Sequence, residues 1–509
     1  MALLLAVEIV GIILAHASAL PATEVTGYPS WLPTHPATTH HVDLRDHGGV
    51  GDGVTLNTAA FASAIAAAHA AGGGLVDVVG GHYVTGPIQL LSGVYLNVAA
   101  DGIVLGSAHR DDWPRAPSSL VRCTNQTNVG IVGGGLVDGQ QPLFVDHYSR
   151  AFDQLLPVSG TPTPPDVPNP WASNCTAGDC RPMLVVFDRC ENVIVRDVTL
   201  THSPMWTNHI LGSTNVLYDN VTVFGDYRWP NGDGIDPDST VNMTIRRTYV
   251  NTGDDAICPK STSTSNGYGP LKNLLIEDCV VRSRSSGFKI GSATFNDIDG
   301  VLVRRLFVHG SNRGLAIQHR DEGSLSNVRF ENVVVDGTHM SPHDWWGAGE
   351  GIWLTSNART AGSAAAAAVG VVENISYVNV TVRRSEGTVL ISSRTSTPIR
   401  NVTLNNVQIK VGTWMPTRQG IVYEGHVHDY RPGPPGEEEF SCADSADGPC
   451  DGIYLKNVDG ASVVGSAVTF VGDRSDPANS WWGSCIGQDA KSSNIAVGDD
   501  FGCHYAPQW

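Results

Sequence analysis

The chain is poor in basic residues. Its 509 residues contain 32 Lys and Arg against 50 Asp and Glu, which gives a formal net charge of −18. A general nucleic-acid binder carries a basic surface patch, and none is visible here, so we expect no nucleic-acid partner. The acidic balance also disfavours long-range electrostatic capture of a polyanion.

Beyond its N-terminus, the chain has no apolar run long enough to span a membrane, and we expect no membrane association. Residues 1–19 instead read as a secretory signal peptide, with a short apolar run and a small-residue site at 17–19. Glu8 inside the run and the lack of a basic residue near Met1 depart from the usual signal pattern. The sequence therefore predicts a secreted, extracellular protein.

The ten cysteines show no spacing typical of a zinc site, and their even number suits an oxidising compartment. Their pairing cannot be deduced from the sequence and stays open. The close pairs are Cys175 with Cys180, Cys442 with Cys450, and Cys485 with Cys503. Sequons for N-glycosylation support a secreted glycoprotein, and they occur at Asn125, Asn174, Asn220, Asn242, Asn374, Asn379 and Asn401.

Aromatic residues make up only 7% of the chain, whereas glycine is abundant at 56 residues. From about residue 128 one short phrase returns, for example NVIVRDVTL at 192, NVLYDNVTV at 215 and NVTLNNVQI at 401, mostly in steps of 23 to 31 residues. Each phrase alternates apolar and polar residues, which is the period of a strand. The opening Asn suits a left-handed corner, where its side chain can stack on the next coil.

This period predicts an all-β fold, a right-handed parallel β-helix of roughly ten coils about 4.8 Å apart. A β-propeller is the alternative, and it would need four strands in each longer repeat. An amphipathic helix over 54–72 is expected to cap the N-terminal end. We expect a β-helix domain at 40–430, C-terminal coils with a disulfide-pinned end cap at 431–509, and inserted loops at 146–185, 338–349 and 358–370.

Three aspartates fall at one phase of consecutive repeats: Asp233 in NGDGID (231–236), and Asp254 with Asp255 in NTGDDA (251–256). The step of 21 residues is about one repeat, so stacked coils would bring the three carboxylates together. Hydrolysis of a glycosidic bond requires such a cluster, with one carboxyl protonated as an acid and others ionised to activate water. The alternative is that Asp and Gly simply populate turns.

Residues 40–430 resemble glycoside hydrolase family 28, the polygalacturonase-like enzymes. The resemblance is carried by AGGGLVDV at 71–78, YVTGPIQLLSGVYLNV at 83–98, GIVLGS at 102–107, SPMWTNHI at 203–210, PNGDGIDPDS at 230–239 and GDDAICPKS at 253–261. It implies that Asp254 is the general acid, that Asp233 and Asp255 hold and deprotonate the attacking water, and that the reaction inverts configuration. It implies no metal and no cofactor. Crowding of like charges should raise at least one pKa.

Two segments depart from the family pattern. Where the family has Gly-His-Gly before Ile-Gly-Ser, this chain has RSSGFKIGS at 284–292, with Ser286 nearest the His position. Where the family has the Arg-Ile-Lys that binds the galacturonate carboxylate, this chain has Ala316-Ile317-Gln318. Because two cations that would neutralise a uronate are missing, we expect polygalacturonate to be a poor substrate. A branched, esterified or rhamnose-containing glycan should be a better one.

Several residues near these segments are candidates for substrate binding: Asn231, Lys260, Ser286, Lys289, Gln318, His209 and Trp206. The cations that could replace the missing pair are Lys260, Lys289, His319 and Arg320, each of which could equally be a solvated charge. His209 could equally be a structural hydrogen-bonding residue. Trp206 and Trp353 could stack on sugar rings, although such residues more often serve packing.

The sequence favours a secreted, monomeric glycosidase that acts on a pectin-like polysaccharide or its oligosaccharides. An exo mode would follow if the loops at 146–185 and 338–349 close one end of the cleft. One alternative is a β-helical polysaccharide lyase, which would use Ca²⁺ held by carboxylates and a Lys or Arg base. The other is a catalytically silent protein that only binds glycans.

Overall fold

The computed structural model describes residues 32–33, 35–114, 118–149, 154–157, 181–262, 267–338, 347, 349–359, 368–412, 451–472 and 483–506. The predicted signal peptide and two of the close cysteine pairs lie outside the described residues. Among the described residues, no helix is long and apolar enough to cross a membrane.

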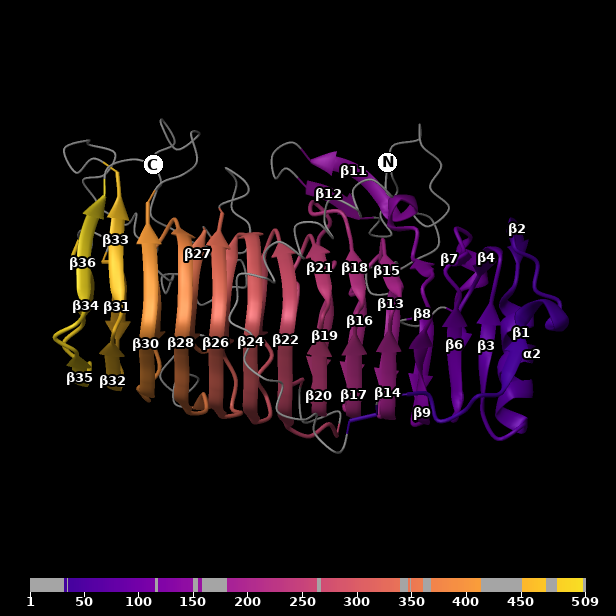
Figure 1. The fold of residues 1–509 in the computed structure, drawn as a ribbon, viewed down its shortest axis with the longest axis horizontal. Coiled ribbons are helices and arrows are strands. Elements are labelled where there is room, and N and C mark those ends of the chain that lie inside the picture. The colour runs from indigo at the N-terminus through magenta and orange to yellow at the C-terminus, as the bar shows by residue number, and fades with distance from the viewer. Residues whose placement is uncertain are drawn as a thin grey trace.

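Parallel strands stacked along one long axis make up most of the described chain (Figure 1). They form a right-handed parallel β-helix, which confirms the predicted fold class. The largest sheet contains β1 (His41–Asp43), β2 (Asp52–Leu56), β3 (Gly74–Val78), β4 (Gly81–Thr85), β6 (Val94–Val98), β7 (Gly102–Gly106), β9 (Thr127–Val132), β10 (Leu136–Asp138), β14 (Glu191–Arg196), β15 (Thr199–Thr201), β17 (Thr214–Asp219), β18 (Thr222–Phe224), β20 (Val241–Arg246), β21 (Tyr249–Thr252), β22 (Leu271–Ser283), β24 (Ile298–Ser311), β26 (Leu325–Gly337), β28 (Val372–Ser385), β30 (Ile399–Val411), β32 (Val458–Val464), β33 (Ala467–Val471), β35 (Ser493–Val497) and β36 (Gly502–Ala506).

A second face of the helix is built from shorter strands in two sheets. Between the two sheets, Ile257 forms parallel bridges with Ile235 on one side and Phe288 on the other, so this face is continuous across the gap. The first of these sheets contains β5 (Ile88–Gln89), β8 (Ser119–Thr124), β13 (Met183–Asp188), β16 (Asn208–Leu211) and β19 (Ile235–Asp238). The second contains β23 (Ser286–Gly291), β25 (Arg313–His319), β27 (Glu350–Ser356), β29 (Val389–Ser393), β31 (Ile453–Lys456) and β34 (Ile486–Gln488).

Equivalent residues of successive coils stack on one another. Val193 pairs with Val216, Val216 with Met243, and Met243 with Leu274, and all four side chains are buried. Burying a side chain of this kind contributes roughly 1.5–3 kcal/mol. The alternating pattern of each phrase therefore becomes a continuous aliphatic core along the helix axis.

The asparagines that open the phrases form a ladder along one corner. Asn192, Asn215 and Asn242 have φ of 56°, 56° and 59°, in the left-handed region. The side-chain amide of Asn215 donates to Asn192 at 3.2 Å, and that of Asn242 donates to Asn215 at 3.1 Å. The predicted role of these asparagines is thus confirmed. Gly300, with φ of 73°, takes the corner position after Asn273 and interrupts the ladder.

The helix α2 (Thr58–Ala70) covers the N-terminal coil (Figure 1). It buries Phe61, Ala64 and Ile65 against the first strands. The prediction of a helix from residue 54 was wrong at its start, because residues 54–56 belong to β2, which pairs with β4. Short 3₁₀ helices are η1 (Leu44–His47), η2 (Arg110–Asp112) and η3 (Gln141–Phe144).

The predicted loop at 146–185 contains regular structure, which corrects that expectation. β11 (Val145–Ser149) and β12 (Gln154–Pro157) form an antiparallel hairpin, and β13 begins at Met183. Leu155 N donates to Arg228 O at 3.0 Å. This bond attaches the hairpin to the loop that leads into β19.

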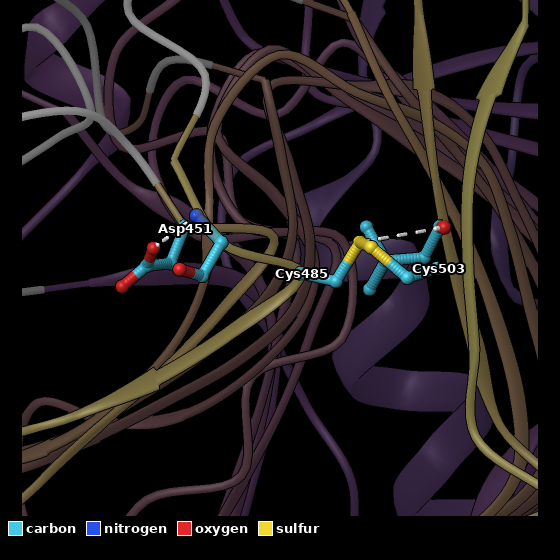
Figure 2. Close-up of a disulfide and its surroundings, with 5 residues drawn as sticks. Asp451, Cys485 and Cys503 are labelled. Carbon is cyan, nitrogen blue, oxygen red and sulfur yellow. Dashed lines mark hydrogen bonds between the residues drawn. A yellow bond between two sulfur atoms is a disulfide. The ribbon is translucent and has the colours of Figure 1, made fainter.

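At the C-terminal end, β31 to β36 continue the stack beyond β29 and β30 (Figure 1). A disulfide joins Cys485, just before β34, to Cys503 in β36, and Figure 2 shows this bond with Asp451 nearby. Asp451 Oδ1 accepts a hydrogen bond from Ser484 N at 2.7 Å. Among the described residues, the cysteines that are buried and not disulfide-bonded are Cys123, Cys190, Cys258 and Cys279.

Candidate active site

The three aspartates of the NGDGID and NTGDDA segments lie side by side on neighbouring coils. Asp233 lies two residues before β19, and Asp254 and Asp255 follow β21. Gly234 N donates to Asp255 O at 2.9 Å, which joins the two segments. Carboxylate oxygens of Asp233 and Asp255 lie within 4.8 Å of one another. All three side chains are buried, with at most 2% of each residue exposed.

Two glycines allow this close approach of backbone segments. A Cβ on Gly234 would lie 2.4 Å from Ala256 O, and a Cβ on Gly253 would lie 2.2 Å from Trp229 O. Such contacts are shorter than any side chain tolerates. The glycines beside the aspartates therefore serve packing as well as turn formation.

Asp254 is held by backbone donors on both carboxylate oxygens. Its Oδ2 accepts from Asn231 N at 3.1 Å, and its Oδ1 accepts from Asp255 N at 2.9 Å. Its carbonyl oxygen accepts from Thr252 Oγ1 at 2.8 Å and from Ser283 Oγ at 2.7 Å. The side chain and the backbone of Asp254 are thus fixed from four directions.

Asp255 is bound to a buried lysine. Lys289 Nζ lies 2.7 Å from its Oδ2, while Ser285 Oγ donates to its Oδ1 at 2.7 Å and Ser286 N donates at 3.2 Å. Cys258 Sγ lies 3.6 Å from Oδ2. A charge-assisted pair with further donors favours the ionised carboxylate. Ser286 therefore contributes to the site through its backbone N–H.

Asp233 shares a second lysine with Asp236. Lys260 Nζ lies 2.7 Å from Asp236 Oδ1, 3.6 Å from Asp233 Oδ2 and 4.0 Å from the centre of the partly exposed Trp206 ring. Burial, reinforced by the neighbouring Asp236, raises the pKa of Asp233 to about 8. Burial also raises the pKa of Asp236 to about 6, against the opposing charge of Lys260. Burial therefore favours the protonated form of Asp233.

His209 lies one coil before the aspartates, in β16. Its backbone pairs with Asp236, and its Nε2 lies 3.0 Å from Asp238 Oδ2. The Trp206 ring meets the imidazole edge-on, with ring centres 5.0 Å apart. His209 and Trp206 thus form the wall of the site next to Lys260.

Gln318 lies farther along the helix, in β25. In the strand register, Ala316 pairs with Lys289, and Gln318 pairs with Gly291. Gln318 is buried, and its Oε1 has no hydrogen-bond partner in the described part of the chain. Trp353 pairs with Ala316 on the next strand and is fully buried. Trp353 therefore packs at this face and does not present an exposed stacking surface.

Three of the candidate replacement cations, Lys289, Lys260 and His319, differ in what they contact. Lys289 and Lys260 are held by carboxylates of the site itself, as described above. His319 is buried, with Nε2 2.6 Å from Gly323 O and Nδ1 3.1 Å from Ser356 Oγ. Burial lowers the pKa of His319, so it is neutral near pH 7. None of these three side chains is a solvated charge, so the alternative that they are merely surface charges is excluded for them.

Two further residues of the site escaped the sequence analysis. Asp236 is the last residue of NGDGID, and its position three residues after Asp233 was the available signal. Arg181 precedes β13 and donates through Nη2 to Asn231 Oδ1 at 3.0 Å. Nothing in the sequence near Arg181 points to Asn231, which lies 50 residues away.

Asp233, Asp255 and Cys258 could together offer ligand atoms to a metal ion. Lys260 and Lys289 place their ammonium groups beside these same two carboxylates. Each ammonium supplies the positive charge that a bound cation would supply. The donor set with its two lysines therefore fits protein cations better than a metal.

Comparison with known proteins gives a consistent result. The model of the family described as glycosyl hydrolases family 28 matches residues 80–425. A probable polygalacturonase from Vitis vinifera is 28% identical over 399 residues, which cover 73% of this chain and 74% of that protein. An exo-poly-alpha-D-galacturonosidase from Dickeya chrysanthemi is 26% identical over 332 residues, which cover 58% of this chain and 55% of that protein.

Among solved structures, the family 28 exopolygalacturonase from Yersinia enterocolitica superimposes with a TM-score of 0.64 at 18% identity. The match covers 91% of this chain and 79% of that one. At this identity the likeness concerns the fold alone.

Proposed function

Because the chain belongs to glycosyl hydrolases family 28, we propose that it is a secreted glycosidase that hydrolyses O-glycosidic bonds of a pectin-like polysaccharide or its oligosaccharides. The observation that carries this proposal is the buried cluster of Asp233, Asp254 and Asp255 beside two lysines. The relatives that match are named as polygalacturonases, which supports a glycan of this class.

The proposed role of each aspartate is the one that the family resemblance implies, and the contact between Lys289 and Asp255 supports the assignment of Asp255. Asp254 donates its proton to the glycosidic oxygen as the bond to the leaving sugar breaks. Asp255, kept ionised by Lys289, takes a proton from the attacking water, and the protonated Asp233 helps to hold that water. Attack from the face opposite the leaving group gives inversion. Asp255 then releases the proton it took from the water, and Asp254 regains a proton from solvent, before the next turnover.

A panel of glycans tests this proposal. The purified protein is incubated with polygalacturonate, its methyl ester, a rhamnose-containing pectin and an unrelated xylan, and the products are identified by mass spectrometry. Hydrolysis adds one water for each bond cleaved, and proton NMR of the first product reports its anomeric configuration. Unsaturated products would instead indicate a lyase, and binding without products would indicate a silent glycan-binding protein.

The signal-peptide pattern of residues 1–19 supports the proposal that the protein is secreted. N-terminal sequencing of the mature protein tests cleavage after residue 19. We also propose that it acts as a monomer. Sedimentation measurements test this directly.

Polygalacturonate is expected to be a poor substrate relative to its methyl ester or to a rhamnose-containing glycan. Ala316 and Gln318 supply no cation, and the charges of Lys260 and Lys289 already belong to ion pairs. A uronate without a cationic partner costs on the order of 2 kcal/mol, or about 30-fold in kcat/KM. The measurement is kcat/KM for each substrate. A strong preference for the free acid would contradict this expectation, whereas Gln318→Lys should move the ratio toward the acid.

Removal of metal ions is expected to leave activity unchanged, because two lysines already neutralise the carboxylates. The measurement is kcat before and after treatment with a chelator, with added Ca²⁺ as the control. Activity that disappears with the chelator and returns with Ca²⁺ would favour the lyase mechanism over hydrolysis.

A further inference from the structure

Arg181 joins the segment before β13 to two loops of the candidate site. Its Nη1 donates to Pro230 O at 2.9 Å and to Pro204 O at 3.4 Å, and its Nη2 donates to Asn231 Oδ1 at 3.0 Å. The guanidinium also lies 5.6 Å from the centre of the Trp229 ring. One side chain therefore fixes the end of the loop that leads to Asp233.

The residue that Arg181 holds is also the residue that holds Asp254. Asn231 N donates to Asp254 Oδ2 at 3.1 Å, and Asn231 adopts a left-handed conformation with φ of 53°. A non-glycine residue in this region needs support from its surroundings. The bond from Arg181 to the Asn231 side chain supplies such support, so the contact to Asp254 depends on it.

The charge of Arg181 differs from those of the two lysines. Lys260 and Lys289 pair directly with carboxylates, whereas the bonds of Arg181 go to two carbonyl oxygens and one amide oxygen. No ion pair with Arg181 occurs within the described ranges of the chain. Burial lowers the pKa of Arg181 to about 10, so it is charged at neutral pH, and its charge acts on Asp254 and Asp233.

We propose that Arg181 is a positioning residue for the general acid. It holds the Asn231 N–H against Asp254, and its positive charge stabilises the carboxylate that remains after Asp254 has donated its proton. This inference rests on the proposed function, and it adds a residue whose contribution arises in the chemical step. Because the guanidinium does not need to touch the glycan, substrate binding should be little affected by its loss.

Kinetics of three variants test the role of Arg181. Arg181→Gln is expected to lower kcat roughly 10- to 100-fold, while KM stays within about threefold, because a misplaced acid impairs chemistry more than binding. The basic limb of the pH profile should move up by about one pH unit, since a carboxyl that loses a nearby cation keeps its proton longer. In Arg181→Lys, the basic limb of the pH profile should return to its wild-type position, but kcat should recover only in part. Arg228→Gln is the matched control, because Arg228 lies on the loop that carries Asn231 but pairs with the partly exposed Asp226.

Two kinetic outcomes would overturn the inference. A rise in KM with unchanged kcat would assign Arg181 to substrate binding instead. Equal behaviour of Arg181→Gln and Arg228→Gln would assign it no role at Asp254. Circular dichroism and thermal unfolding of each variant separate these outcomes from misfolding, and Arg181→Lys remains informative if Arg181→Gln does not fold.

An NMR titration tests the same inference without any substrate. In protein carrying isotope-labelled aspartate, the Asp254 resonance is assigned by its loss in Asp254→Asn. Its titration midpoint should rise in Arg181→Gln and return in Arg181→Lys. An unchanged midpoint would overturn the inference even if the wild-type protein hydrolyses glycans. A changed midpoint in a protein that hydrolyses none of the glycans would support the local coupling and reject the proposed function.

Discussion

Replacing Asp254 by asparagine is expected to lower kcat by about 10²–10⁴-fold while the fold stays intact, because an amide cannot deliver a proton to the glycosidic oxygen. The loss should be smaller for a substrate with an activated leaving group such as nitrophenolate, which departs without protonation. The measurement is kcat for a glycan and for the nitrophenyl glycoside, in the variant and in the wild type.

The matched control for this prediction is Asp197→Asn, since Asp197 is partly exposed and pairs with Arg196 at a distance of 3.2 Å. Asp233→Asn is the informative second variant, because burial raises the pKa of Asp233 to about 8 and it too carries a proton near neutral pH. If the activated substrate restores turnover in Asp233→Asn and not in Asp254→Asn, then Asp233 is the general acid and Asp254 holds the water. Unchanged turnover in a folded Asp254→Asn protein would reject its role altogether.

Replacing Lys289 by methionine is expected to affect both stability and activity. It would leave the fully buried Asp255 without the ammonium that lies 2.7 Å away, and breaking a buried ion pair in this way costs about 3–5 kcal/mol. A base that has lost its cation holds its proton more tightly, so the acidic limb of the pH profile should move to higher pH. Chemical denaturation and the pH dependence of kcat/KM measure the two effects.

Two variants control the Lys289 prediction. Lys289→Arg keeps the charge and should recover most of the stability, although its larger guanidinium has to fit a closed site. Lys272→Met removes an exposed lysine from β22 and should change neither quantity. If Lys289→Met unfolds at the same denaturant concentration as the wild type, then Lys289 does not stabilise Asp255.

The strands and their corners could be read from the sequence because each coil repeats the same local pattern. Alternation in the phrases at 192 and 215 places Val193 and Val216 inward, and the opening asparagines reach the left-handed region at Asn192 and Asn215. Both features depend on neighbours within one phrase or one coil away. Local pattern and global stacking agree here, which is why the fold class was predictable.

Boundaries and inserted segments were harder to predict because they depend on distant partners. Residues 54–56 (Val-Thr-Leu) directly precede the alanine-rich segment that predicts the helix, yet they lie in β2, which pairs with β4. The side chain of Asn57 fixes this transition by bonding to Val50 N at 2.7 Å and to Val84 O at 3.2 Å. The hairpin of β11 and β12 likewise bonds to Arg228, far along the chain.

The sequence predicted that the three aspartates of the site lie close together, but it did not predict which side chains pair with them. The phase of the repeats places Asp233 near Asp255. The direction of each lysine side chain depends instead on the register of its strand against the neighbouring strand. Lys289 reaches Asp255 from a strand one coil further along, and this removes it from the set of cations available to a substrate. Such pairing is a property of register between coils, which composition and spacing do not encode.

The paired carboxylates have a consequence for the net electrical state of the site. The set comprises the carboxylates of Asp233, Asp236, Asp254 and Asp255 and the cationic side chains of Lys260, Lys289 and Arg181. With every group ionised, one negative charge remains, and with a proton on Asp233 the set is neutral. A chain of net charge −18 thus carries an electrically balanced candidate active site. Capture of a glycan there depends on close contact rather than long-range attraction, so turnover should tolerate wide changes in ionic strength.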